Sequence, residues 1–157
     1  KKGLAKAEKK GDRIAAAGLI DSYVHSERIG VLVEVNCETD FVARTEDFKN
    51  FVHDVAMHIA ASAPEYITPE DVPEEVVEKE KSIESEALKS EGKPKEIVEK
   101  ILKGKIDKYF EQVCLTKQSF IKNPDQTIED YTKEMIAKLG ENIVISQMAR
   151  IELGGKS

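Results

Sequence analysis

The fold is decided by residues 31–61, which read VLVEVNCETDFVARTEDFKNFVHDVAMHIAA. The first seven of these residues are apolar apart from Glu34 and Asn36, and this pattern predicts a β-strand with at least one buried face. The acids and the threonine of residues 38–40 end the strand. Apolar residues then recur at helical spacing and predict a helix over residues 46–62. The core-facing residues of this helix are Phe48, Val52, Val55 and Ile59, with Phe51 and Ala56 beside them.

Phe41 stands among acids at the end of the predicted strand. An aromatic side chain in such a place must either pack into the protein's own core or be presented to another molecule. In the first alternative, Asp40 caps the following helix and Phe41 packs beneath it. In the second, Phe41 is an exposed wedge with an acid beside it, the kind of anchor that dominates binding energy at interfaces. The residues by themselves leave both alternatives open.

Two further strands complete the predicted sheet. Residues 18–25 are predicted to form one of them. The polar turn 26–28 joins it to the strand that ends at residue 37, and so short a connection predicts an antiparallel hairpin. Gly30 in the return strand is expected to mark a close backbone approach. A helix starting at residues 125–127 is expected to end at Gly140, a natural C-cap, and a third strand follows over residues 143–153. Three strands need helices to cover one face, so the predicted class is α+β.

The middle of the chain predicts two long helices. Residues 73–90 are highly charged, with Val76, Ile83 and Ala87 as a thin apolar seam. A Gly-Pro breaker at residues 91–94 follows. The second helix carries a coiled-coil-like stripe made of Val98, Leu102, Ile106, Tyr109 and Val113. We therefore expect an antiparallel helical hairpin, inserted at about residues 73–113, that protrudes from the main body because its seams are thin.

Composition excludes several classes of function. The chain has 157 residues, 34% of them charged, and a formal net charge of −6. This balance argues against direct binding of nucleic acid, whose phosphates attract clustered Lys and Arg. No apolar run approaches the roughly 18 residues of a membrane span. Residues 1–17 are expected to form a basic linker or arm, and Cys37 and Cys114 are expected to be reduced, buried thiols.

No constellation of catalytic or metal-binding residues stands out. Glu34, Glu38 and Asp40 resemble an acid–base set, but strand alternation and solvent exposure explain them more simply. His53 and His58 are five residues apart on one helix, which is the wrong spacing for sharing a metal ion. There is no nucleophile elbow and no phosphate-binding glycine loop. We therefore expect a protein that is not an enzyme and uses no metal or cofactor.

Several motifs resemble those of elongation factor Ts, the guanine-nucleotide exchange factor for elongation factor Tu. The resemblance runs in order along the chain from about Gly18 to Leu153. It is carried by VEVNCETDFVAR at residues 33–44, HIAASAPEYITPEDV at 58–72, GKPKEIVEKILKGKIDKYFEQVCL at 92–115 and KLGENI at 138–143. The resemblance implies one core module over residues 18–157 that lacks the small N-terminal helical domain of the family.

The resemblance also implies which residues bind elongation factor Tu. Asp40 and Phe41 match the pair that intrudes beside the helix holding the Mg²⁺ site of the GTPase, and Thr39 and Val42 belong to the same motif. The turn at Leu139 and Gly140 matches a second contact, although Gly140 is a helix cap in either case. His25 aligns with a family histidine that touches elongation factor Tu. Without the resemblance, a lone histidine near a strand end is most often a surface or core histidine with no special chemistry.

The implied function is exchange of GDP during translation elongation, with elongation factor Tu as partner in its GDP-bound and nucleotide-free forms. A second copy of the chain is a further candidate partner, because some members of the family carry two modules and others one. The expected compartment is the bacterial cytoplasm, or an organellar matrix or stroma for a eukaryotic source. The alternative is a scaffold whose helical hairpin docks a partner without affecting nucleotide. A carboxylate-based hydrolase is a weaker rival.

Overall fold

The computed structural model describes residues 10–155. They form, in chain order, β1 (Ala17–His25), β2 (Ile29–Cys37), α2 (Asp40–Ala43), α3 (Glu46–Ser62), the short 3-10 helix η1 (Pro69–Asp71), α4 (Glu74–Ser90), α5 (Lys95–Val113), a second 3-10 helix η2 (Leu115–Lys117), β3 (Ser119–Phe120), β4 (Asn123–Thr127), α6 (Ile128–Leu139) and β5 (Val144–Glu152). The chain divides into two compact units. One runs to Ala63 and resumes at Ser119, and the other spans Pro64–Gln118. The predicted α+β class is confirmed.

The first unit is built on a three-stranded antiparallel sheet in the order β1-β2-β5. The β1–β2 hairpin pairs without a break from Ala17 opposite Cys37 to His25 opposite Ile29. Its turn is tight because Ser26 and Glu27 both take the left-handed backbone conformation, with φ of 51° and 57°. All three predicted strands are therefore confirmed to within about a residue at each end.

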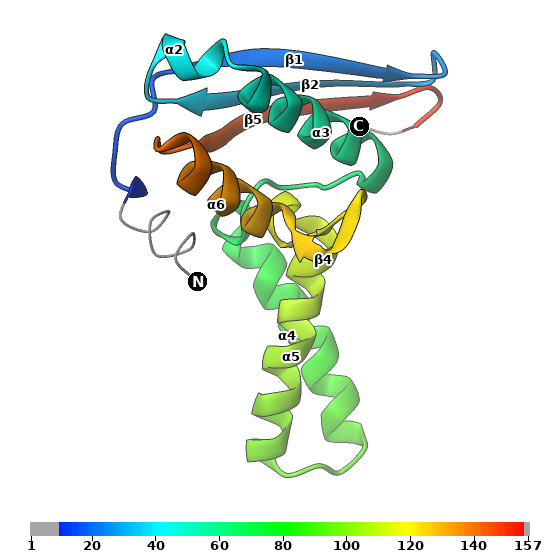
Figure 1. The fold of residues 1–157 in the computed structure, drawn as a ribbon. Helices are drawn as coiled ribbons and strands as arrows, with labels where there is room; N and C mark the ends of the chain where they lie inside the picture. The colour runs from blue at the N-terminus through cyan, green and yellow to red at the C-terminus, as the bar shows by residue number, and fades with distance from the viewer. Residues whose placement is uncertain (1–9, 156–157) are drawn as a thin grey trace. The chain divides into compact units, whose positions relative to one another are not determined.

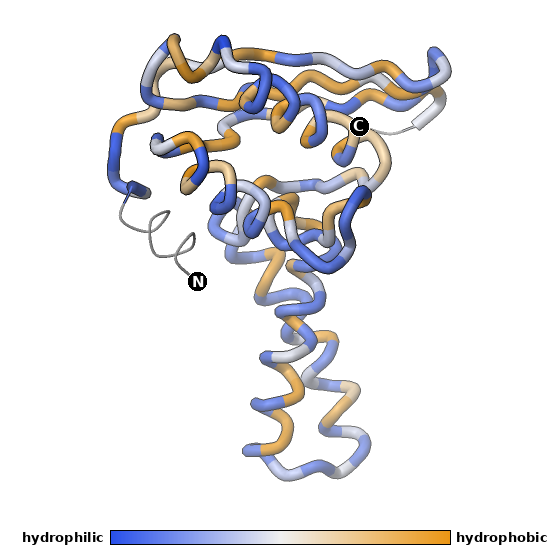
Figure 2. The backbone as a smooth tube through the Cα atoms, in the orientation of Figure 1, coloured by the Kyte–Doolittle hydropathy of each residue, from blue (hydrophilic) through white to orange (hydrophobic). Residues whose placement is uncertain are grey.

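One face of this sheet is covered by α3 and makes the core of the first unit (Figure 1). The alternate residues of β2 that point to α3 are almost wholly buried, and they are Val31, Val33, Val35 and Cys37. Every residue of the predicted helical stripe is also buried, from Phe48 to Ile59. Figure 2 shows the resulting alternation of apolar and polar segments along the strands and along α3. Thr45 caps α3, and the left-handed Ala63 ends it.

A small hairpin that the sequence did not predict, β3–β4, directly precedes α6 in the first unit. His58 of α3 is fully buried, and its Nδ1 accepts a hydrogen bond from the Ile121 amide. Asp54 of α3 accepts hydrogen bonds from the Tyr131 hydroxyl at 2.7 Å and from Lys122 Nζ at 2.8 Å. Burial, and then the bond to Asp54, raise the pKa of Tyr131, so its hydroxyl stays protonated and keeps donating.

The second unit contains the predicted pair of helices, α4 and α5, which pack against each other. Their seam buries Leu88 of α4 with Val98 and Ile106 of α5. The predicted seam of α4 was wrong in part, since Ile83 is 55% exposed and Ala87 is exposed. Beside the helices, a second cluster buries Val72, Val113 and Cys114 under partly buried residues that include Tyr66 and Tyr109.

Both cysteines are free and buried, as the sequence predicted. Burial raises the pKa of the Cys114 thiol to about 11, followed by the effect of the nearby Asp71 carboxylate. This thiol is therefore protonated at neutral pH and is a poor nucleophile. Within residues 10–155, no helix has both the length and the apolar character needed to cross a membrane.

The close backbone approach predicted at Gly30 is found instead at Gly18. A Cβ atom on Gly30 would meet nothing within 4 Å, whereas one on Gly18 would lie 2.2 Å from the Val35 carbonyl oxygen. Gly18 also has a φ of 142°, which side-chain-bearing residues rarely adopt. Gly18 therefore lets β1 approach the backbone of β2 closely at Val35 and Asn36.

We expect Gly18→Ala to lower the free energy of unfolding by about 2 kcal/mol or more, because a clash with backbone cannot be relieved by a rotamer change. The matched control is Gly30→Ala, in the paired strand with open space around it, and it should change stability by no more than about 0.5 kcal/mol. Urea unfolding followed by circular dichroism measures both. Equal stability of the two variants would contradict the prediction.

Candidate functional site

Phe41 lies on α2, a one-turn helix that begins where β2 ends. Its side chain is 81% exposed, whereas the next two residues, Val42 and Ala43, are buried. Thr39 is the N-cap of this helix, and its hydroxyl oxygen accepts a hydrogen bond from the Val42 amide. The alternative in which Asp40 caps a helix and Phe41 packs beneath it is therefore wrong. A single turn has one inward side, and Val42 and Ala43 occupy it.

A reciprocal set of hydrogen bonds joins α2 to the turn after α6, and we call it the clasp. The Glu141 carboxylate accepts from the amides of Glu38 and Thr39, at 3.1 and 3.0 Å, and from the Thr39 hydroxyl at 2.8 Å. In return, the Glu38 carboxylate accepts from the Asn142 amide at 2.7 Å. The clasp connects residues more than a hundred positions apart in the sequence. It holds the two turns of the site together.

The segment before β1 is attached to the same place. Lys10 Nζ donates to the Gly140 carbonyl at 3.0 Å. The Asn142 side chain is nearly buried and donates to the carbonyls of Gly11 and Arg13, at 3.3 and 2.8 Å. Arg13 also lies 3.8 Å from the Glu38 carboxylate. The described part of the predicted basic arm thus contacts the site, while its residues 1–9 lie outside the described part of the chain. The domain boundary at residue 17 stays a prediction.

The turn at Leu139 and Gly140 adopts the predicted C-cap geometry. Gly140 has a left-handed φ of 78°, and its amide donates to the Ile136 carbonyl at 2.9 Å. Both residues are half-buried. Because Glu141 follows directly, the clasp places this turn next to α2, so four of the predicted site residues lie in one region: Asp40, Phe41, Leu139 and Gly140.

β1 ends at the side of the sheet away from α2 (Figure 1), and His25 is the last residue of β1. It is exposed, and its Nδ1 shares a hydrogen bond of 2.9 Å with the Tyr23 hydroxyl. His25 is paired with Ile29, and the nine residues of β2 from Ile29 to Cys37 span roughly 26 Å at about 3.3 Å per step. The structure therefore does not bring His25 together with Phe41 on one small surface.

The buried thiol of Cys37 lies near the acidic side chains of the site. Burial, followed by the effect of Glu141, raises the pKa of the Cys37 thiol, and Asp40 and Glu38 act in the same direction. The protonated thiol donates to the Thr39 carbonyl at 3.2 Å. In the part of the chain that the structure describes, no group of three His, Cys, Asp or Glu residues is placed to hold a metal ion. The exposed feature of the site is the Phe41 side chain on α2.

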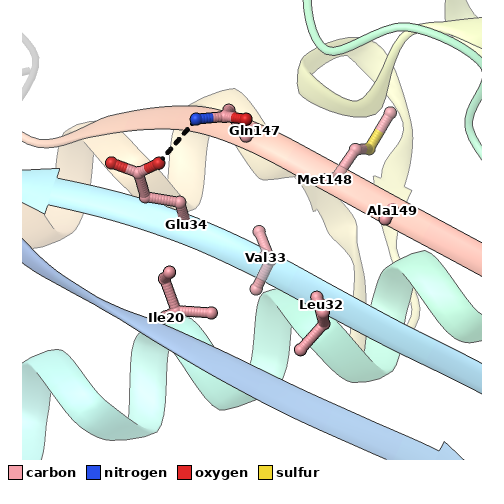
Figure 3. A pocket seen from close by; sticks show the side chains of 7 residues that line it. All are labelled: Ile20, Leu32, Val33, Glu34, Gln147, Met148 and Ala149. Atoms are coloured by element: carbon pink, nitrogen blue, oxygen red, sulfur yellow. Dashed lines mark hydrogen bonds between the residues drawn. The ribbon is translucent and has the colours of Figure 1, made fainter.

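The face of the sheet turned away from α3 carries a shallow apolar hollow around Ile20 and Leu32 (Figure 3). Exposed apolar side chains of this face come from all three strands and include Ile20 (67% exposed), Val24 (64%), Leu32 (54%) and Ile151 (70%). Glu34 lies on the same face, where its carboxylate accepts hydrogen bonds from the side chains of Gln147 and Asn36. An apolar patch of this kind is typical of an interaction surface.

Comparison with known proteins shows the family of the chain. The family model described as "Elongation factor TS" matches residues 8–154. The chain belongs to the elongation factor Ts family. It is 56% identical to elongation factor Ts of Carboxydothermus hydrogenoformans, over 98% of this chain and 71% of the relative. It is 54% identical to the factors of Syntrophus aciditrophicus and Moorella thermoacetica, again over 98% of this chain and over 77% and 76% of those relatives. The resemblance read from the sequence is thus confirmed.

Sequence reasoning missed the residues that hold the site together. Glu38, Glu141 and Asn142 lie inside the quoted motifs, but Glu38 was considered only as part of an acid–base set, and Glu141 and Asn142 were given no role. The motif GENI at residues 140–143 was a signal that this turn mattered. Nothing in a single sequence tells which backbone amides a carboxylate will meet a hundred residues away.

Proposed function

We propose that this chain is a guanine-nucleotide exchange factor that promotes release of GDP from elongation factor Tu during translation elongation. One observation carries the proposal, namely that Phe41 is 81% exposed at the tip of a firmly held turn. Leaving a Phe side chain in water forgoes about 1.5–3 kcal/mol that its burial would contribute to folding. An exposed aromatic side chain that lowers folding stability in this way is typical of a binding anchor.

In this proposal each predicted site residue has a distinct part. Phe41 enters elongation factor Tu beside its Mg²⁺ and nucleotide site, and Asp40 accompanies it as a rim carboxylate. Thr39 and the buried Val42 shape the turn that presents them. Leu139 and Gly140 form a second contact next to the first. His25 contacts elongation factor Tu separately, at the far end of the sheet.

Exchange by this route is a linkage effect without covalent chemistry. The factor and GDP·Mg²⁺ each bind elongation factor Tu, and each lowers the other's affinity by the same factor. The Mg²⁺ ion of elongation factor Tu neutralises the nucleotide phosphates, so displacing its ligands weakens the hold on GDP. Each tenfold gain in release rate needs about 1.4 kcal/mol of barrier reduction. A hot-spot aromatic is worth about 2 kcal/mol or more and is large enough to supply part of this.

Phe41→Ala should leave the fold intact and slow stimulated release of fluorescent GDP from elongation factor Tu by at least about tenfold. Asp40→Ala should act in the same direction but more weakly, because a rim charge contributes less than a buried aromatic. The matched control is Ile83→Ala, an exposed apolar residue of the hairpin, which should exchange normally. Normal exchange by Phe41→Ala would favour the scaffold alternative, in which the chain binds without affecting nucleotide.

The Mg²⁺ ion gives a second test. Stimulation of GDP release should be large at millimolar free Mg²⁺ and should shrink when Mg²⁺ is chelated, because the contact to be disrupted is then already absent. Reciprocity requires that saturating GDP·Mg²⁺ weaken binding of the chain to elongation factor Tu, which titration calorimetry measures. An affinity that GDP·Mg²⁺ leaves unchanged would mean that the two bind without competing.

We also propose that a second copy of the chain covers the open face of the sheet. Of the strand residues on that face, Glu34 alone is ionisable, and its carboxylate already accepts hydrogen bonds within the sheet. Each copy would therefore bring one carboxylate to that face, while most of the charge behind its net −6 lies elsewhere on the chain. Sheets pack face to face in this way in β-sandwiches.

Leu32→Glu, at the middle of the central strand, should convert the resulting dimer to monomer in light scattering at micromolar concentration. Ile83→Glu in α4 is the matched control, because the two side chains are 54% and 55% exposed. The control should remain dimeric. A monomeric unsubstituted chain at these concentrations would contradict the pairing proposal and leave the exchange proposal untouched.

A further inference from the structure

We infer that Glu141 is a positioning residue for exchange, holding α2 in the one conformation that presents Phe41 to the partner. This inference rests on the proposed function and adds to it a residue that acts through Phe41. Its basis is the clasp, in which one carboxylate accepts from two successive backbone amides and from the hydroxyl that caps α2.

The helix needs such help because of its length. An isolated turn of α-helix is unstable, since ordering its backbone costs more than its first hydrogen bonds return. α2 has only four residues, and Val42 and Ala43 are its only buried ones. The amides of Glu38 and Thr39 precede the helix and have no helical carbonyl to meet. Glu141 supplies an anionic acceptor for both, and hydrogen bonds to a charged group are the stronger kind.

The Thr39 hydroxyl carries the effect of Glu141 into the helix. It donates to Glu141 at 2.8 Å and accepts from the Val42 amide at 3.3 Å. Donating to the carboxylate fixes the side chain in the orientation that capping requires. The chain of bonds therefore runs from Glu141 through Thr39 to the turn on which Phe41 stands, with no contact between Glu141 and Phe41 needed.

The clasp commits two carboxylates to one short turn. Glu38 and Glu141 each accept hydrogen bonds from the turn that carries the other, and Arg13 lies 3.8 Å from Glu38. These bonds hold α2 in one conformation before a partner is met. Rigid presentation lowers the ordering cost at binding, which is the usual benefit of preorganisation.

The first test uses a probe of the turn that does not depend on activity. The chain contains no Trp, so Phe41→Trp introduces a single indole at the tip of α2. Adding Glu141→Gln should lower the fluorescence anisotropy of that indole in the free protein, because an amide cannot accept all three hydrogen bonds. Glu134→Gln, on the exposed side of α6, removes the same charge and should leave the anisotropy unchanged.

The second test is a double-mutant cycle in the GDP-release assay. Glu141→Gln alone should slow stimulated release about tenfold, the usual effect of losing a charge-assisted hydrogen bond. In the Phe41→Ala background it should have almost no further effect, because a residue that acts through Phe41 has nothing left to position. In the His25→Ala background its effect should persist in full. Thr39→Val should resemble Glu141→Gln, and Thr39→Ser, which keeps the hydroxyl, should restore exchange.

Failure of this inference and failure of the proposed function give different results. If Phe41→Ala exchanges normally, the proposed function is wrong. If Phe41→Ala is defective but Glu141→Gln exchanges normally, or leaves the anisotropy unchanged, Glu141 does not position the turn and the inference alone is overturned. Effects of Glu141→Gln and Phe41→Ala that add fully in the cycle would also overturn it, because they would show independent action.

Discussion

Burial of one face of β2 against α3 is the constraint on which the rest of the first unit depends. Val33, Val35 and Cys37 are at most 1% exposed. A shift of the strand by one residue would move these side chains to the solvent face of the sheet. The fixed register also decides where the strand ends. Cys37 is the last residue of the buried row, and the chain leaves the sheet directly after it. The position of the site is therefore a consequence of core packing.

The clasp solves a problem that the core leaves open. The core determines where the chain emerges but does not determine the conformation of Thr39 and Asp40, which are exposed. A second turn, brought alongside by α6 and β5, supplies the missing acceptor through Glu141. Because each turn donates to a carboxylate of the other, ordering one favours ordering the other. The Asn142 side chain attaches the segment before β1 to the same place, so three distant parts of the sequence meet there.

Regular elements were predictable from sequence because their patterns are long. The alternation in β2 and the stripe from Phe48 to Ile59 each repeat several times, and the structure confirms both. Other features could not be predicted. The strand β3 has only two residues, too few to show an alternating pattern. The seam of α4 was misassigned because Ile83 and Leu88 are both apolar and only Leu88 is buried. Which glycine faces a neighbouring backbone depends on strand register, so Gly18 and Gly30 could not be told apart in advance.

The site shows the same division between local and distant information. Phe41 could be singled out from its acidic neighbours, and its exposure rules out the alternative in which it packs into the core. The support for Phe41 comes from residues far away in the chain, and local patterns do not report it. This division has a physical meaning for an exchange factor. An exposed anchor contributes most to binding when its conformation is already ordered, because the entropy of ordering is then lost during folding and not at the encounter. In the role proposed for Phe41, much of its contribution would therefore depend on Glu141 and Thr39, through bonds that form before any partner arrives.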